Sequence, residues 1–380
     1  MRLLALLFCT CASLAQAAGL TVQTLDIKGK NNRGEAYAKG QMTMPLVKAK
    51  QTGDEPNAKI AKKINDRLSF IDTQGNESQR FTVSRNDDRI LTIAFDNEGC
   101  GAYCENYSTW YSFDLQDGSL LTATNLFTPN GMFALTARLR REQINNYQQQ
   151  LDTLGKERKA AQAKGSGPTG KTSKAQQEII SDLDDRITLN KNCLDDQRTK
   201  VKETASQQTL ARFSNDQISA FEITEKTFKL TAGRCSNHAM RALDDVGNVV
   251  LSLPYPELAP WLTAYGKTVL LNDGSAPPAE RIYGQLLHGT LGGQTAITML
   301  IEKQEENSIR GSYFYDRFRT PIELSGTLTG QTLELIELTE PKPGQSKKDT
   351  TLRLTQTASE LRGQWASKAA NKQFDVRLAP

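Results

Sequence analysis

Residues 165–172, GSGPTGKT, fit the phosphate-loop pattern G-x-x-x-x-G-K-[ST] at every fixed position. In that motif the backbone N–H groups of a glycine-rich turn hold phosphates, Lys171 would reach the terminal ones, and the Thr172 hydroxyl would bind magnesium. The motif works only between a buried strand and a helix. The preceding residues, GKERKAAQAK, have the pattern of a charged helix instead. We therefore predict a turn at this segment and no nucleotide binding.

Cysteines are the next residues that could carry chemistry. Cys9 and Cys11 lie in the predicted signal peptide described below, and the others are Cys100, Cys104, Cys193 and Cys235. An even number of cysteines in an oxidising compartment favours two disulfides, for which three pairings exist. Gly99 and Gly101 would let the backbone bend so that Cys100 and Cys104 approach each other. We favour the pairs Cys100–Cys104 and Cys193–Cys235.

The two histidines could serve a zinc ion or a nucleophile. Cys235 and His238 stand three residues apart, as zinc ligands can, but no second C-x-x-C pair appears and His288 lies far off in the sequence. His288 stands among glycines in LLHGTLGG, which is more typical of a turn or strand edge than of a catalytic base. No pair of acids stands out among the 43 Asp and Glu residues. We expect no metal, no cofactor and no catalytic residue.

Aromatic and acidic side chains gather in sequence around Cys100 and Cys104. The aromatic residues are Tyr103, Tyr107, Trp110 and Tyr111, and the acidic residues are Asp96, Glu98, Glu105 and Asp114. Aromatic residues in such a run either fill the core on one strand face or form a binding surface. The acids could add a negative patch for a basic partner. Most such residues pack in the core on one strand face, and a binding surface at this position is the alternative that we consider.

The elements that must position these residues follow from the spacing of apolar residues. In residues 56–71, Ile60, Ile64, Leu68 and Ile71 recur at helical spacing, which predicts an amphipathic helix. Residues 89–99 alternate apolar and polar positions, which predicts a strand, and residues 107–121 predict a second strand that ends in a turn at Asp117 and Gly118.

From about residue 134 to about residue 207 polar, helix-favouring residues dominate. Two sets of apolar residues recur there at helical spacing. They are Leu135, Leu139, Ile144, Tyr147, Leu151 and Leu154 in the first half, and Ile180, Leu183, Ile187, Leu194 and Val201 in the second. The second set has the spacing of a coiled-coil seam. We predict an antiparallel coiled-coil hairpin whose tip contains the phosphate-loop pattern.

The last hundred residues contain about seven or eight short apolar runs, spaced by about ten residues with turn residues between them. This pattern predicts an antiparallel β meander, closed as a barrel or a sandwich. The predicted fold is therefore α+β, with a signal peptide at 1–17, an α+β domain at 18–271 with the helical hairpin inserted, a linker at 272–280 and an all-β domain at 281–380.

The chain opens MRLLALLFCTCASLAQAAGL, with one basic residue, an apolar run and the small residues Ala15 and Ala17. This is typical of a cleavable secretory signal, and the apolar run of about twelve residues is shorter than the roughly twenty that a membrane span needs. The net charge of +4 has both signs mixed along the chain, which disfavours nucleic-acid binding. We expect a periplasmic or secreted protein without a membrane span.

Several segments together resemble a known family. They are MPLV, AKIAKKINDRL, RILTIAFDNEG, YSFDLQDGSLLTATNLF, FEITEKTFKL and NVVLSLPYPELAPWL. These segments resemble the extracellular domain of the lysozyme-sensing anti-sigma factor of RsiV type, an uncharacterised domain that also stands beside the catalytic domain in PdaC-type peptidoglycan deacetylases. The resemblance covers roughly residues 20–271, interrupted by the helical hairpin, and implies an envelope location.

The departures from that family limit what the resemblance implies. A signalling member would carry a cytoplasmic sigma-binding segment and a membrane span, and a deacetylase would carry an Asp-His-His zinc set that two scattered histidines do not supply. The remaining prediction is a non-enzymatic envelope protein that binds lysozyme or peptidoglycan. The alternatives are an unrecognised envelope hydrolase or peptidoglycan-modifying enzyme, and a structural envelope scaffold.

Overall fold

The computed structural model describes residues 19–31, 34–71, 73, 75–100, 103–165, 173–206, 220–278, 282–303, 307–338, 350–357 and 359–380. The predicted signal peptide lies outside these ranges, and so do residues 166–172 of the phosphate-loop pattern. No helix within these ranges combines the length and the hydrophobicity that crossing a bilayer requires.

The first part of the chain contains a two-stranded and a three-stranded antiparallel sheet with one helix. Its elements are β1 (Leu20–Asp26), β2 (Thr43–Ala49), α1 (Glu55–Leu68), β3 (Asn76–Asn86), β4 (Ile90–Cys100) and β5 (Cys104–Asp114). The helix and strands that the sequence predicts here are confirmed.

Helix α1 forms for local reasons. The Asp54 carboxylate accepts a hydrogen bond from the Asn57 backbone N–H at 3.2 Å and so caps the first turn. The predicted apolar face then covers one face of the β3–β4–β5 sheet, where Ile64 and Leu68 are buried with Leu91 and other strand residues. Burial of this stripe holds the sheet and the helix together.

A second core joins this sheet to the elements that flank the helical hairpin in the chain. These elements are α2 (Ala123–Leu126), β6 (Phe221–Ile223), β7 (Thr227–Ala232), η3 (His238–Leu243), β8 (Val249–Pro254), α5 (Tyr255–Leu258) and α6 (Ala264–Leu271). Strands β6, β7 and β8 form an antiparallel sheet, and Phe228 of this sheet packs against Phe127 with ring centroids 5.0 Å apart. Ile90, at the start of β4, belongs to the same core.

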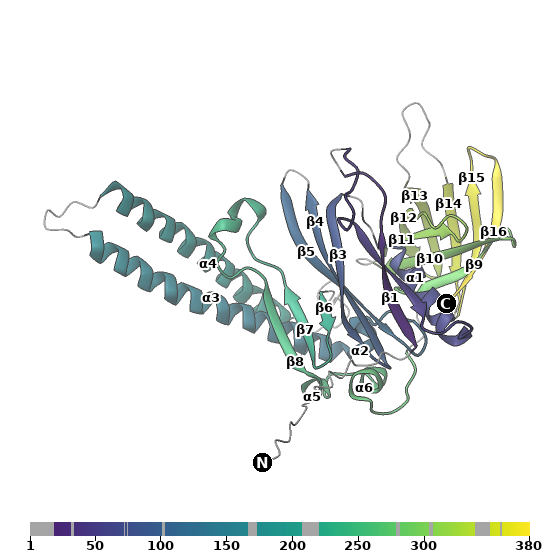
Figure 1. Ribbon diagram of the computed structural model, residues 1–380, viewed down its shortest axis with the longest axis horizontal. Helices are drawn as coiled ribbons and strands as arrows, with labels where there is room; N and C mark the ends of the chain where they lie inside the picture. Colours follow the sequence, from purple (N-terminus) through teal and green to yellow (C-terminus); the bar gives the residue numbers. More distant parts are fainter. Residues whose placement is uncertain are drawn as a thin grey trace, which may run out of the picture.

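Two long helices, α3 (Pro129–Gly165) and α4 (Lys174–Ser206), project from the rest of the molecule as an arm (Figure 1). They run antiparallel, since an Arg140 Nη1–H near the base donates to the Lys200 carbonyl at 2.8 Å and Arg158 pairs with Asp184 nearer the tip. Because Gly165 ends α3, a helix and not a strand precedes the phosphate-loop pattern, as the sequence predicts.

The apolar residues of the arm pack in two places. Tyr147, Leu154, Leu183 and Leu194 are buried between the two helices. Leu135 and Leu139 instead join the core with Phe127 and Phe228, which fixes the base of the arm to the sheets.

The C-terminal strands close into an eight-stranded barrel in which all neighbours are antiparallel. The strands are β9 (Leu286–Leu291), β10 (Thr295–Lys303), β11 (Ser308–Tyr315), β12 (Ile322–Thr329), β13 (Thr332–Leu338), β14 (Thr350–Gln356), β15 (Leu361–Ser367) and β16 (Lys372–Ala379). The last strand pairs with the first, with Val376 opposite Leu291. The predicted meander is confirmed, and it is a barrel and not a sandwich.

Glycines allow the barrel strands to approach each other closely. A Cβ atom built on Gly289 would lie 1.8 Å from the Arg377 carbonyl oxygen, and one on Gly363 would lie 1.9 Å from the Arg353 carbonyl oxygen. No side chain fits at these positions, which is typical of strands that bend to close a small barrel.

The barrel contacts α1 through aromatic and charged residues. The rings of Phe70 and Phe314 stack with centroids 4.8 Å apart. Arg319 of the barrel pairs with Asp66, a carboxylate that is fully buried in α1. Together these contacts hold the barrel against the helix.

Candidate functional site

A groove with a cavity volume of about 1200 Å³ lies between the β3–β4–β5 sheet and the β6–β7–β8 sheet. The first sheet contributes Arg80, Asp96 and Trp110 to its walls. The second wall comes from β7, β8 and the loop between them, which contribute Arg234 and Asn237 among others. Both sheets lie at the base of the helical arm (Figure 1).

The alternation of side chains along β5 separates the predicted aromatic residues. Trp110 pairs with Ala94 across the sheet and lines the groove. Tyr111 points to the opposite face, where its ring meets that of Phe95 edge to face at 5.7 Å. Burial raises the pKa of the Tyr111 phenol. Tyr111 is therefore a core residue, and its prediction as part of an exposed binding surface is wrong because neighbouring residues of a strand face opposite sides.

The other two predicted aromatic residues lie near the β4–β5 hairpin. Tyr107 lines the groove, and its hydroxyl donates a hydrogen bond to Asn76 Oδ1 at 2.8 Å. Tyr103 is 65% exposed and stacks on His238 of η3 with ring centroids 4.4 Å apart. Since His238 lines the groove from the opposite wall, this stack joins the hairpin to that wall.

Three of the predicted acids have partners near the groove. Asp96 accepts a hydrogen bond from the Ser108 hydroxyl at 2.8 Å. Glu105 pairs with Arg234 at 2.5 Å and lies 3.7 Å from His238 Nδ1. These contacts connect the two walls of the groove. Glu98 accepts a hydrogen bond from Ser78 at 3.3 Å, and it is not among the residues that line the groove.

Asp114 lies far from this group, at the other end of β5. It is 2% exposed, pairs with Arg89 at 2.9 Å and accepts a hydrogen bond from the Tyr265 hydroxyl at 2.8 Å. Burial and the Asp114 charge raise the pKa of Tyr265. The prediction that Asp114 adds to an exposed acidic patch is therefore wrong, because the second core covers this end of the strand.

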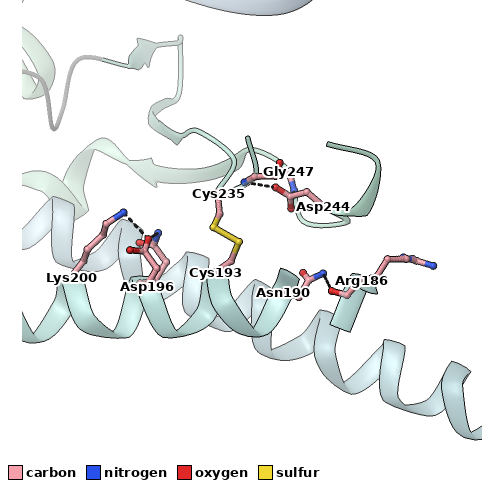
Figure 2. Close-up of a disulfide and its surroundings, with 10 residues drawn as sticks. Arg186, Asn190, Cys193, Asp196, Lys200, Cys235, Asp244 and Gly247 are labelled. Carbon is pink, nitrogen blue, oxygen red and sulfur yellow. Dashed lines mark hydrogen bonds and ion pairs between the residues drawn. A yellow bond between two sulfur atoms is a disulfide. The ribbon is translucent and has the colours of Figure 1, made fainter. Parts of the chain in front are cut away.

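Both predicted disulfides are present. Cys100–Cys104 joins the two strands of the hairpin, with Cα atoms 4.0 Å apart. Cys193–Cys235 joins α4 to the loop after β7, as Figure 2 shows. Disulfides are typical of an oxidising compartment.

The second disulfide positions one wall of the groove. Cys235 comes directly before Ser236, Asn237 and His238, which line the groove. In the same loop the Asp244 carboxylate accepts a hydrogen bond from the Gly247 N–H at 3.0 Å (Figure 2). It accepts another from the Ser236 N–H at 3.1 Å. The helical arm thus holds this loop by a covalent bond, and the loop's own hydrogen bonds fix its shape.

Within the described ranges, one group of potential metal ligands comes together, and it consists of Glu98, Cys100 and Cys104. The two sulfur atoms are bonded to each other, so they are not available as thiolate ligands. Cys235 is also in a disulfide, which removes the Cys235–His238 zinc pair considered from the sequence.

Sequence reasoning missed the basic and amide side chains of the groove. Arg80 lies on β3, and Arg234, Asn237 and Asn248 lie around the loop between β7 and β8. One local feature of the sequence could have indicated these residues, because Arg234 stands directly before Cys235, a predicted disulfide cysteine. His288 lies outside the groove, on β9 of the barrel.

Comparison with known proteins adds little. No protein-family model and no curated protein matches the chain. Among the solved structures that match is a member of the DUF3298 family from Bacteroides fragilis, at 10% identity and a TM-score of 0.36, over 68% of this chain and all of that one. A domain of that uncharacterised kind is compatible with the resemblance seen in the sequence, and no argument about function rests on it.

Proposed function

We propose that this protein is a secreted, non-catalytic component of the bacterial cell envelope that binds peptidoglycan fragments in the groove between the two sheets. The observation that carries the proposal is the side-chain composition of the groove. Trp110 and Tyr107 offer aromatic surface on which a sugar ring can stack. Arg80, Asn237 and Asn248 offer donors for the hydroxyl, acetamido and carboxylate groups of a muropeptide.

The size of the groove fits a ligand of that kind. Pockets that bind small molecules usually have volumes of about 300–1,000 Å³. The groove is somewhat larger, at about 1200 Å³, and is open to solvent. Such a shape suits a segment of a polymer better than an isolated small molecule.

Lysozyme, the other ligand class that the resemblance implies, is less well supported. A strongly basic enzyme needs an acidic partner surface. Of the four acids considered, Asp114 is buried and Glu105 is paired with Arg234. The walls of the groove also carry Arg80, which opposes a basic partner.

The proposal includes two further features of the chain. Residues 1–17 act as a signal peptide for export, which the two disulfides support. The arm of α3 and α4 packs as a coiled coil, which is supported by one apolar cluster that contains Leu154, Leu183 and Ile187. In this arrangement the arm stabilises the groove through the Cys193–Cys235 bond.

Calorimetric titration of the mature protein with soluble disaccharide-peptide muropeptides tests this function. We expect saturable heat, and a loss of affinity of about thirtyfold in Trp110→Ala, as for a central aromatic contact. The matched control is Phe318→Ala, which removes an exposed aromatic ring of the barrel far from the groove. It should leave the affinity unchanged.

Three results would contradict the proposal. No heat up to about 1 mM muropeptide would remove its basis. Heat with lysozyme alone would assign the other ligand class. Cleavage or deacetylation of the muropeptides, seen by mass spectrometry after incubation, would show an enzyme.

A further inference from the structure

The turn between β11 and β12 presents an aromatic side chain to solvent. Phe318 is 67% exposed, more than any other large hydrophobic side chain in the described ranges. The guanidinium of Arg317 lies over its ring, 5.5 Å from the centroid. A cation and an aromatic ring thus stand together on this turn, and neither residue lines the groove.

Backbone and side-chain contacts fix the shape of the turn. The N–H groups of Phe318 and Arg319 both donate to the Tyr315 carbonyl, at 2.8 and 2.9 Å. Arg319 has a φ of 53°, in the left-handed region that a residue other than glycine seldom adopts. Its guanidinium pairs with the buried Asp66 carboxylate and lies 5.9 Å from the Phe314 ring centroid, which stabilises that conformation. The backbone on both sides of Phe318 is therefore anchored, and the ring stays exposed.

A shallow hollow of about 340 Å³ borders the turn at Arg319. Its lining contains three cations, which are Lys48 of β2, Lys62 of α1 and Arg319, and it contains no acid. Asp66 pairs with both Lys62 and Arg319, so this one buried carboxylate balances only part of their charge. The surface beside Phe318 is therefore positive.

The acid of the turn itself is directed away from this surface. Asp316 Oδ1 accepts a hydrogen bond from the Thr298 hydroxyl at 2.8 Å, and Thr298 is fully buried in β10. Arg317 is exposed, and within the described part of the chain it has no carboxylate within 4.0 Å. The four cations of the turn and the hollow thus outnumber the two acids there, which are both hydrogen-bonded.

The apolar part of this surface is too small for a stable protein interface. Such an interface buries about 800 Å² on each partner, around an apolar centre of several side chains. Here one ring stands out from a positively charged surface. A single exposed aromatic side chain among cations fits the boundary of a lipid bilayer, where the ring enters between the headgroups and the cations meet their negative charge.

We propose that this surface docks the protein onto a bilayer that contains anionic lipids. Phe318 enters the layer between headgroups and acyl chains, and Arg317 and Arg319 lie against the headgroup phosphates. Lys48 and Lys62 add to the attraction from the hollow. With one ring and a few cations the attachment is reversible. The groove stays free for its own ligand, because none of these residues lines it.

Co-sedimentation of the full mature protein with vesicles tests the docking surface. One set of vesicles contains phosphatidylcholine alone, and the other contains equal parts of phosphatidylcholine and phosphatidylglycerol. We expect the anionic vesicles to bind at least about tenfold more tightly at low salt, because several cations act together. Raising the ionic strength should reduce this difference, since salt screens exposed charges.

Exposed residues allow variants that leave the fold intact. Phe318→Ala should weaken binding to the anionic vesicles by about tenfold, as expected for one large apolar side chain that leaves water. Arg317→Ala should weaken it by about fivefold. Arg310→Ala is the matched control, because it removes the same charge from an exposed position near the other end of β11. It should change vesicle binding by less than about twofold.

Equal binding to the anionic and the neutral vesicles would overturn the proposal. So would a Phe318→Ala variant that binds the anionic vesicles as tightly as the unchanged protein. An equal loss of affinity in the Arg317 and Arg310 variants would show attraction by general charge and not by this turn. Muropeptide titration of the Phe318→Ala variant is a separate readout, so membrane docking and groove binding can each fail without the other.

Discussion

Removing the Cys193–Cys235 disulfide tests how the helical arm supports the groove. The change is the double variant Cys193→Ala and Cys235→Ala, which avoids a free thiol. The bond closes a loop with a sequence separation of 42 residues. In the chain-entropy treatment, releasing a loop of that length stabilises the unfolded chain by about 4 kcal/mol at room temperature. Cys193 is fully buried, and alanine leaves little of its volume unfilled.

The hairpin disulfide provides a matched comparison within the same molecule. Cys100–Cys104 has a sequence separation of only 4 residues. The same treatment gives it about 2 kcal/mol, so the Cys100→Ala and Cys104→Ala variant should lose about half as much stability. Both variants remove two sulfur atoms and one bond, and they differ chiefly in loop length.

Urea unfolding, followed by circular dichroism, measures both losses under identical conditions. The long-loop variant should also bind muropeptides more weakly, because Cys235 holds the loop with Asn237 and His238 against α4. Equal losses of stability in the two double variants, or a larger loss from the hairpin pair, would refute the reasoning from loop length. Unchanged muropeptide affinity in the long-loop variant would refute the supporting role of the arm.

Two further predictions concern buried polar groups. Asp114→Asn should lower the free energy of unfolding by about 3 kcal/mol, because Arg89 then lies near the core without its charge partner. The control is Asp96→Asn, since Asp96 is an exposed acid on the adjacent strand. It should lower the free energy of unfolding by less than about 0.5 kcal/mol in the same urea assay. Burial raises the pKa of the Tyr255 phenol to about 12 in the folded protein. As the pH rises, the unfolded chain therefore loses the phenol proton first, near pH about 10. The free energy of unfolding should fall from that pH upward until the folded tyrosine also loses its proton. Tyr255→Phe should make that fall shallower, and an unchanged pH dependence would contradict the assignment.

The sequence by itself predicted the features that depend on neighbouring residues. The apolar face of α1 follows from helical spacing within one turn or two, and residues such as Ile64 and Leu68 lie where that spacing puts them. The barrel strands pair mostly with their neighbours along the chain, so short apolar runs separated by turns were enough to predict a meander. The hairpin disulfide also joins near neighbours, and its flanking glycines indicated it.

Strand periodicity shows which residues share a face, but it does not show which face or which end of the strand will be covered. Trp110 and Tyr111 are both large aromatic residues of β5, yet Tyr111 packs under α1 and Trp110 lines the groove. Asp114 is buried because Tyr265, much later in the chain, packs over the end of β5. That covering depends on contacts between distant segments, which the local pattern does not contain.

The tertiary structure alone decided barrel closure and the groove between the two sheets. Closure requires β16 to pair with β9, with Val376 opposite Leu291, and a sandwich would have satisfied the same strand pattern. The groove combines Trp110 of β5 with Arg234 of the loop after β7. These residues are brought together only when the separate sheets bury their apolar faces against each other, because that burial fixes the relative positions of segments that share no local signal.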